Sequence, residues 1–251
     1  MLEICDLEFS YEKDIVFSGI SFVLKRGEVC AILGKNGVGK TTLLKIISGI
    51  EKANGGTIII DDKKKKFNRM VYDDVSYLRQ NATYDAELTV FEVILLALKE
   101  NSFFIKEKER ENVKEVLKEM GIFDLSERYL YQLSGGQQKL VFIAQAISRN
   151  KNILLLDEPM NNLDYYNQHF IMQEIRNVCR EKGLTVIIAM HDVNMALSFA
   201  DKTLIMTDHG MYGFGNPNEI VNTKMMEEVF HVKAVIEESR MGKYVNVIGI
   251  M

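Results

Sequence analysis

Apolar and polar positions alternate along the first third of the chain. The segments 2–9 and 15–24 show this alternation loosely, and 29–33 and 57–60 are almost wholly apolar or β-branched. Both patterns predict strands, the first with one buried face. With a further short run at 75–78, this part of the sequence is expected to be rich in β-structure.

The spacing of apolar residues changes in the middle of the chain. In 88–98 and 105–120 they recur every three or four positions, with charged residues between them. This period predicts amphipathic helices, and residues 103–106 between the two are expected to form a surface loop. Together with the apolar stripe of 140–147, these segments predict that 81–149 is a helical insertion in a strand-rich domain.

The fully apolar run 153–156 predicts a central strand of a parallel sheet, since such strands are buried on both faces, and 184–190 repeats this buried-strand pattern. The chain is therefore expected to be one α/β domain of 251 residues, in which 1–80 and 150–251 form the core around the insertion. The remaining expected elements are a strand at 202–207, a turn at 210–215, helices at 218–221 and 225–230, and strands at 232–236 and 244–250.

The composition is ordinary for a soluble globular protein, with 47% hydrophobic and 26% charged residues. The net charge of −4 gives no sign of a nucleic-acid partner. The four lysines at 63–66 are expected at a solvated hairpin tip. No apolar run approaches the roughly 18 residues that span a bilayer, and no signal peptide is apparent, so a cytoplasmic location is expected. Cys5, Cys30 and Cys179 lack metal-ligand spacing and are expected to be reduced, mostly buried thiols.

A glycine-rich segment between the run 29–33 and an apolar-striped helix carries chemistry. It has the form G-x-x-x-x-G-K-S/T, which is typical of a phosphate-binding loop. Glycines let backbone amides approach the phosphates, Lys40 would reach the β- and γ-phosphates, and the Thr41 hydroxyl would bind Mg²⁺. The predicted nucleotide-binding residues of this segment are Gly34, Lys35, Asn36, Gly37, Val38, Gly39, Lys40, Thr41 and Thr42.

Two carboxylates stand at the end of the first buried strand. Asp157 and Glu158 follow 153–156, and ligands of open α/β sheets bind at the carboxyl ends of strands. Neighbouring strand residues point in opposite directions, so Asp157 is predicted to face Mg²⁺ and Glu158 the water that attacks the γ-phosphate. The alternative is an acidic pair that caps the next helix. His191 ends the second buried strand and is predicted to reach the γ-phosphate or to orient the water.

Three further candidates each have an ordinary alternative. Residues 134–137 begin a helix and are either an anion site or a plain N-cap. Tyr11, in the turn between the first two strands, either stacks on an adenine or packs locally. Gln80 is a lone polar residue at the end of 75–78.

Taken in order, these segments resemble the motifs of the nucleotide-binding subunits of ATP-binding cassette (ABC) transporters. The motifs are Walker A at 34–42, the Q-loop glutamine Gln80, the LSGGQ signature at 133–137, Walker B at 153–158 and the switch histidine His191. The resemblance runs over the whole chain, and 161–164 is similar to the D-loop. It implies a P-loop NTPase core with a β-rich N-terminal subdomain and an inserted α-helical subdomain.

The resemblance also implies roles for these residues. Lys40 and the loop amides would hold the phosphates of ATP, and Thr41 and Gln80 would ligate Mg²⁺, with Asp157 supporting the metal through water. Glu158 would be the catalytic base, His191 would contact the γ-phosphate, and Tyr11 would stack on the adenine. The signature would bind ATP held by the opposite subunit, so that two chains enclose two ATP molecules. The signature residues concerned are Ser134, Gly135, Gly136 and Gln137.

Some positions depart from the common family pattern. Met160-Asn161-Asn162 stands where Thr-Ser-Ala is usual, Gln138-Lys139 replaces an arginine-rich continuation of the signature, and Arg79 takes the place of a proline. None of these changes removes a catalytic group, and the D-loop change bears on coupling between the two ATP sites.

Three features are similar to the importers of iron chelates, haem and cobalamin. They are the sequence of 77–80, the short helical insertion and the closing segment 228–232. The resemblance implies transmembrane permease partners, a homodimer or a sister ATPase subunit, and indirectly a solute-binding protein, at the cytoplasmic face of the membrane. The groove around Gln80 and 81–98 would receive a coupling helix of the permease.

The alternative functions are a soluble cassette protein that acts on ribosomes or DNA, and a P-loop kinase or GTPase. Soluble cassette proteins usually carry two cassettes or long coiled coils, whereas this chain has one phosphate loop, one signature and no heptad run. A kinase or GTPase leaves the signature and His191 without a role. A transporter ATPase without nucleic-acid partners is therefore favoured.

Overall fold

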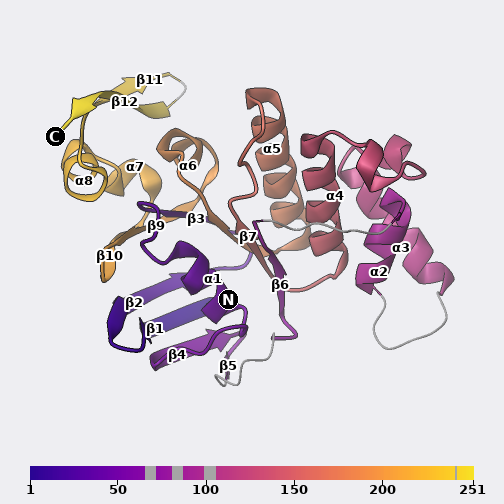
Figure 1. Cartoon of the computed structure of the whole chain (residues 1–251), viewed down its shortest axis with the longest axis horizontal. Helices are drawn as coiled ribbons and strands as arrows, with labels where there is room; N and C mark the ends of the chain where they lie inside the picture. The colour runs from indigo at the N-terminus through magenta and orange to yellow at the C-terminus, as the bar shows by residue number, and fades with distance from the viewer. Residues whose placement is uncertain (66–71, 81–86, 99–105, 241) are drawn as a thin grey trace.

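The computed structural model of the chain describes residues 1–65, 72–80, 87–98, 106–240 and 242–251. Within these ranges the strands form a four-stranded sheet, a six-stranded sheet and a separate hairpin, and helices pack between and around them (Figure 1). The predicted α/β class is confirmed.

The four-stranded sheet is antiparallel in the order β2-β1-β4-β5. Its strands are β1 (Leu2–Tyr11), β2 (Asp14–Leu24), β4 (Gly55–Ile60) and β5 (Lys63–Lys64). Apolar residues on one face, such as Ile4 and Ile58, are buried in a core with helix α1 (Lys40–Ile47). The same core includes one face of the six-stranded sheet, so α1 lies between the two sheets.

The six-stranded sheet has the order β10-β9-β3-β8-β7-β6. Five strands are parallel, and β10 (Gly210–Gly215) pairs antiparallel with β9 at one edge. The parallel strands are β3 (Val29–Leu33), β6 (Val75–Leu78), β7 (Ile153–Asp157), β8 (Thr185–Ala189) and β9 (Lys202–Thr207).

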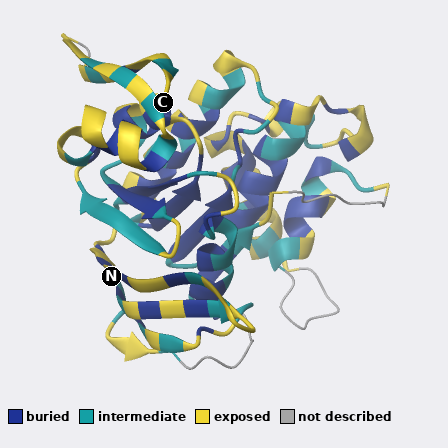
Figure 2. Cartoon of the chain, turned by 60° about the vertical axis from the view of Figure 1, so that its left-hand side comes forward, coloured by how far each residue is buried: buried dark blue, intermediate teal, exposed yellow. Residues whose placement is uncertain are grey.

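Every residue of β3, β7 and β8 is buried, as predicted for central strands (Figure 2). The face of the sheet away from α1 packs against α4 (Gly135–Ser148), α5 (Tyr165–Lys182) and α6 (Val193–Phe199). Parallel strands end at the same edge of a sheet. The phosphate loop after β3, the carboxylates at the end of β7 and the histidine after β8 therefore meet at one edge.

The helices α2 (Val90–Leu98), α3 (Glu107–Glu119) and α4 pack on one another at one end of the molecule (Figure 1). The 3₁₀ turns η1 (Phe123–Leu125) and η2 (Leu130–Gln132) connect α3 to α4. The helices predicted in this region are confirmed, with ends that differ by a few residues. In the predicted loop at 103–106, only Lys106 is described, as the N-cap of α3. The division into a core and an insertion at 81–149 stays a prediction.

The chain closes with three short helical segments and a hairpin. They are α7 (Pro217–Ile220), α8 (Thr223–Met225), the π-helical turn η3 (Met226–Phe230), β11 (Val232–Ser239) and β12 (Gly242–Ile250). The buried Val245 of β12 exchanges two backbone hydrogen bonds with the Asn194 side chain of α6, at 2.7 and 3.0 Å. These bonds fix the hairpin to the core.

Two local predictions were wrong. Residues 210–215, predicted as a turn, form the edge strand β10, because the turn is made by Asp208 and His209. The hairpin tip predicted at the lysines 63–66 is formed instead by the two preceding residues, Asp61 and Asp62. The first two lysines therefore already belong to β5. In both hairpins a non-glycine residue takes the left-handed conformation, with φ of 71° at His209 and 47° at Asp61.

The three thiols are free. Cys30 and Cys179 are buried, as predicted, whereas Cys5 is only half-buried. Burial raises the pKa of the Cys30 thiol to about 12. In the described ranges of the chain, no helix is long and apolar enough to cross a membrane.

Asp61 supports a prediction about stability. Its carboxylate accepts hydrogen bonds from Arg26 at 2.8 Å, from the Met1 amine at 2.7 Å and from Asn152 at 2.9 Å. The Arg26 guanidinium and then the Met1 amine lower the pKa of Asp61 from 3.8 to about 2. A carboxyl whose pKa is lowered by folding stabilises the protein above its unfolded pKa, and this stabilisation is lost as the pH falls through the folded value.

We therefore expect Asp61→Asn to reduce the free energy of unfolding by about 1 kcal/mol at pH 7. The difference from the parent protein should shrink as the pH falls below 3.8 and vanish below about pH 2. Urea unfolding at several pH values measures it, with the exposed Asp73→Asn as the matched control. A difference that does not change with pH would contradict the prediction.

Candidate functional site

The phosphate loop joins β3 to α1 in a conformation that requires glycine. Gly34 and Gly39 have φ of 152° and 102°. A Cβ atom at Gly34 would lie 2.8 Å from the carbonyl oxygen of Met206, and one at Gly39 would lie 2.7 Å from a methyl carbon of Val16. Both contacts are too short for any real side chain, so the neighbouring strands force the glycines of the motif.

Lys40 begins α1 and is only 5% exposed. Its Nζ donates hydrogen bonds to the carbonyl oxygens of Gly34 at 2.8 Å and Lys35 at 2.9 Å, so the ammonium group lies inside the loop. Burial lowers the pKa of Lys40, while the nearby Glu158 and Asp157 oppose this shift. The structure thus places the loop lysine beside both predicted acidic residues.

The other predicted residues of the loop are also in place. Val38 is buried in the core shared by the two sheets, whereas Asn36 is exposed. Thr42 is half-buried in the first turn of α1. The predicted loop residues therefore form one continuous turn between β3 and α1.

Asp157 ends β7 and lies 3% exposed between two hydroxyl donors. Thr41 of α1 donates to its Oδ1 at 3.0 Å, and Tyr77 of β6 donates to its Oδ2 at 3.1 Å. Burial raises the pKa of Asp157, and the hydrogen bonds from Thr41 and Tyr77 counteract this shift. Burial and the same carboxylate raise the pKa of Tyr77 strongly. The Tyr77 hydroxyl is not among the site residues predicted from the sequence.

Glu158 gathers three polar side chains from separate parts of the sequence. His191 Nε2 lies 2.5 Å from Oε1, while Gln80 Nε2 and Asn161 Nδ2 donate to Oε2 at 2.7 and 2.5 Å. Glu158 has a φ of 49°, and its backbone N–H donates to Ala189 at the end of β8. Gln80 and His191, which the sequence shows as isolated residues, thus meet at one carboxylate.

Asn161 is a contact that the sequence analysis missed. It stands three residues after Glu158, in the segment similar to a D-loop. The composition of that segment is unusual for the family, but composition alone does not indicate that the Asn161 amide hydrogen-bonds to Glu158. The sequence signal for this contact is the position of an asparagine only three residues after Glu158, which directly follows the strand β7.

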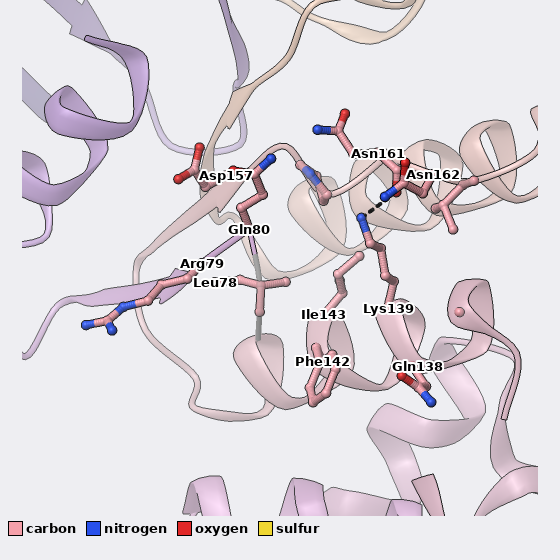
Figure 3. A pocket seen from close by; sticks show the side chains of 13 residues that line it. Leu78, Arg79, Gln80, Gln138, Lys139, Phe142, Ile143, Asp157, Asn161 and Asn162 are labelled. Carbon is pink, nitrogen blue, oxygen red and sulfur yellow. Dashed lines mark hydrogen bonds between the residues drawn. The ribbon is translucent and has the colours of Figure 1, made fainter. Parts of the chain in front are cut away.

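A pocket of about 320 Å³ lies beside these residues (Figure 3). The end of β6, the first turns of α4 and the segment after β7 line it. Across it, Lys139 of α4 donates to the carbonyl oxygen of Asn161 at 2.7 Å. Burial lowers the pKa of Lys139 and Glu158 opposes this shift. The pocket therefore lies between α4 and the edge of the sheet that carries Asp157, and Lys139 bridges it.

The signature segment caps α4. The Ser134 side chain accepts from the Gln137 N–H at 3.3 Å, and the Gln137 side chain accepts from the Ser134 N–H at 3.1 Å. Gly135 is exposed, while Gly136 is buried against Asn167, where a Cβ would lie 3.1 Å from the Asn167 side chain. The start of α4 is thus a capping box, in which Ser134 and Gly135 are exposed.

Tyr11 ends β1 and is 51% exposed, with its ring edge-on to Phe9 at a centroid distance of 4.7 Å. In the described part of the chain, neither Tyr11 nor Ser134 hydrogen-bonds to Asp157 or Glu158. The structure therefore gathers Lys40, Thr41, Gln80 and His191 around the two carboxylates within one chain. It leaves Tyr11 and the first two residues of the signature helix start, Ser134 and Gly135, exposed.

A buried lysine inside a glycine loop, next to a strand-end aspartate that a threonine holds, defines the class of P-loop nucleoside triphosphatases. The family described as "ABC transporter" matches residues 17–161, which is more than half of the chain. The chain belongs to this family and is an ABC ATPase, as the five motifs predicted.

Relatives and solved structures agree with this assignment. An uncharacterized ABC transporter ATP-binding protein of Methanocaldococcus jannaschii is 38% identical over 243 residues, which cover 96% of this chain and 95% of that protein. The petrobactin import ATP-binding protein YclP of Bacillus subtilis is 29% identical over 97% of this chain and 99% of its own length. A solved inward-facing metal-chelate type ABC transporter superposes with a TM-score of 0.85 and 25% identity, covering 100% of this chain and 97% of that chain.

Proposed function

We propose that this chain is the ATP-hydrolysing subunit of an importer for iron chelates or chemically similar solutes such as haem or cobalamin. The convergence of Gln80, His191 and Asn161 on Glu158, beside Asp157 and Lys40, supports the hydrolytic part of this proposal. The relatives that are named for petrobactin import and for metal-chelate transport support the solute class.

The donor groups beside the phosphate loop fit Mg²⁺. Thr41 offers a hydroxyl, Asp157 a carboxylate and Gln80 an amide oxygen, and hard oxygen ligands of this kind are what Mg²⁺ prefers. Thr41 and Gln80 would hold the ion, and Asp157 would support it through water. Bound Mg²⁺ supplies charge stabilisation at the phosphates.

The chain's own residues then share the work of hydrolysis. Lys40 and the amides of the loop bind the phosphates of ATP, and Tyr11 offers an exposed ring for the adenine. Glu158 takes the proton of the attacking water as general base. His191 and Gln80 already orient that carboxylate, and His191 contacts the γ-phosphate once nucleotide is bound.

The signature residues Ser134 and Gly135 are exposed, and a second subunit would bring its bound nucleotide to them. The N-terminus of α4, a helix of 14 residues, offers backbone N–H groups and Ser134 to an anion. Two copies of the chain, or this chain and a sister subunit, enclose two ATP molecules, with each signature completing the site of the other subunit. Closure on ATP and opening after hydrolysis move a transmembrane permease pair, which a solute-binding protein loads.

The permease places the chain at the cytoplasmic face of the membrane. A permease coupling helix would bind in the groove around Gln80 and 87–98. Residues 81–86 of the predicted groove lie outside the described residues.

Purification of the chain from its native membranes in mild detergent tests the proposal. We expect a polytopic membrane protein to copurify, and the solute-binding protein of the same system to bind an iron chelate, haem or cobalamin. The control is a purification in high salt and harsh detergent, which should remove a peripheral subunit. Copurifying ribosomal proteins, without a membrane partner, would contradict the proposal and favour a soluble cassette protein.

A further inference from the structure

The two oxygens of the Asp157 carboxylate have different donors. Thr41 lies 3.0 Å from Oδ1, and the hydroxyl of Tyr77 lies 3.1 Å from Oδ2. The aspartate is 3% exposed, so these donors stand where solvent would otherwise hydrate the carboxylate. Thr41 is proposed to bind the metal ion, whereas the function proposed above gives the Tyr77 hydroxyl no role.

The strand register explains why Tyr77 reaches this oxygen. Tyr77 of β6 pairs with Leu155 of β7, and side chains two positions apart on a strand share a face. Leu155 is buried in the core that contains α1, and Tyr77 packs against the same core. Tyr77, Leu155 and Asp157 therefore face α1 and the loop, and the tyrosine ring has little freedom to move.

A second bond joins the same two strand ends. Gln80, three residues after Tyr77, donates to Glu158, the residue after Asp157. Gln80 is exposed and lies beyond the end of β6, while Tyr77 is half-buried within the strand. The inner bond is thus made by a rigid side chain on a rigid element, as the positioning of a ligand requires.

We propose that Tyr77 is a positioning residue, which holds the Asp157 carboxylate in the orientation that supports the nucleotide-bound metal ion. The Asp157 carboxylate can rotate about the Cα–Cβ and Cβ–Cγ bonds of its side chain. A single hydrogen bond from Thr41 to Oδ1 still allows the carboxylate to rotate about the axis of that hydrogen bond. The phenol fixes the second oxygen and directs Oδ1 toward Thr41. This role rests on the proposed function of the site in metal-dependent ATP hydrolysis.

Tyr77→Phe tests this role because it removes one oxygen atom and keeps the ring that packs in the core. Mn²⁺ serves as the probe, and its binding in the presence of ATP is measured by electron paramagnetic resonance in the full chain, in a Glu158→Gln background. We expect the Kd for Mn²⁺ to rise about five- to tenfold. ATP binding in EDTA should stay within about twofold of the parent protein, since the metal is then absent.

The matched control is Tyr212→Phe. Tyr212 lies on β10, at the opposite edge of the six-stranded sheet from β6, and it is also partly buried. This variant should bind Mn²⁺ and ATP like the parent. In the background with Glu158 intact, Tyr77→Phe should raise the Mg²⁺ concentration for half-maximal ATPase activity more than it lowers the maximal rate.

Three results would overturn the role of Tyr77. Unchanged Mn²⁺ affinity in Tyr77→Phe would show that the hydroxyl does not act on the metal site. An equal loss of ATP affinity in EDTA would show that the bond only maintains the fold. If the parent protein itself fails to bind Mn²⁺ with ATP, the proposed metal site is wrong, and the role of Tyr77 fails with it.

Discussion

Glu158→Gln is expected to lower the rate of ATP turnover at least about a hundredfold while ATP binding is retained. The amide has the shape of the carboxylate but accepts no proton from water at neutral pH. The carboxylate oxygens are within 2.7 Å of donors on His191 and Gln80, so the substituted side chain keeps its place among them. Because bound ATP is not hydrolysed, the signature of a second subunit can stay bound to it. The variant should therefore accumulate as an ATP-bound dimer.

Phosphate release and size-exclusion chromatography in the presence of ATP measure these two effects. Glu115→Gln, on the exposed face of α3, is the matched control and should behave like the parent protein. Turnover at the parent rate in the Glu158→Gln protein would exclude Glu158 as the general base. A variant that neither turns over ATP nor binds it would instead indicate a damaged phosphate loop.

The phosphate loop and the two carboxylates can be located from the sequence because each is a local feature. The phosphate loop is contiguous, and a Cβ atom at Gly34 or Gly39 would lie only 2.8 or 2.7 Å from atoms of neighbouring strands. Likewise Asp157 and Glu158 follow the apolar run 153–156, whose short length favours a buried strand. These features are encoded within a few residues of one another, so periodicity and spacing suffice to find them.

Contacts between segments far apart in the chain could not be predicted from the sequence pattern. Gln80 and Glu158 are separated by 78 positions, and only the family resemblance suggested that both belong to one site. The Tyr77 bond to Asp157 depends on the register of β6 against β7, and a one-residue shift would turn the hydroxyl to the other face. A strand pattern alone does not give the register between strands.

The wrong local predictions have a related cause. Glycines at 210–215 were interpreted as a turn, yet the left-handed residue of that hairpin is His209. Glycine in an edge strand is tolerated when the neighbouring strand supplies the order, and β9 does so here. Pairing with a neighbouring strand, here β9, can therefore determine the local structure even where the glycine content favours a turn.

Lys40→Ala is expected to raise the Kd for ATP at least about a hundredfold, a loss of about 3 kcal/mol. Lys40 is the buried cation of the phosphate loop, and its Nζ is held by two loop carbonyls at the point where phosphates would bind. Displacement of a fluorescent ATP analogue measures the affinity. Lys114→Ala, at an exposed lysine of α3, is the matched control and should bind ATP like the parent protein.

The fold itself should survive this substitution. Burial lowers the pKa of Lys40, which means that folding desolvates the charged amine at a cost. Alanine removes this cost together with the two hydrogen bonds to Gly34 and Lys35, so the two effects offset each other. We expect the free energy of unfolding without nucleotide to change by less than about 1 kcal/mol. Lost binding in a protein of unchanged stability assigns the phosphates to Lys40, whereas parent-like affinity would show that they bind elsewhere.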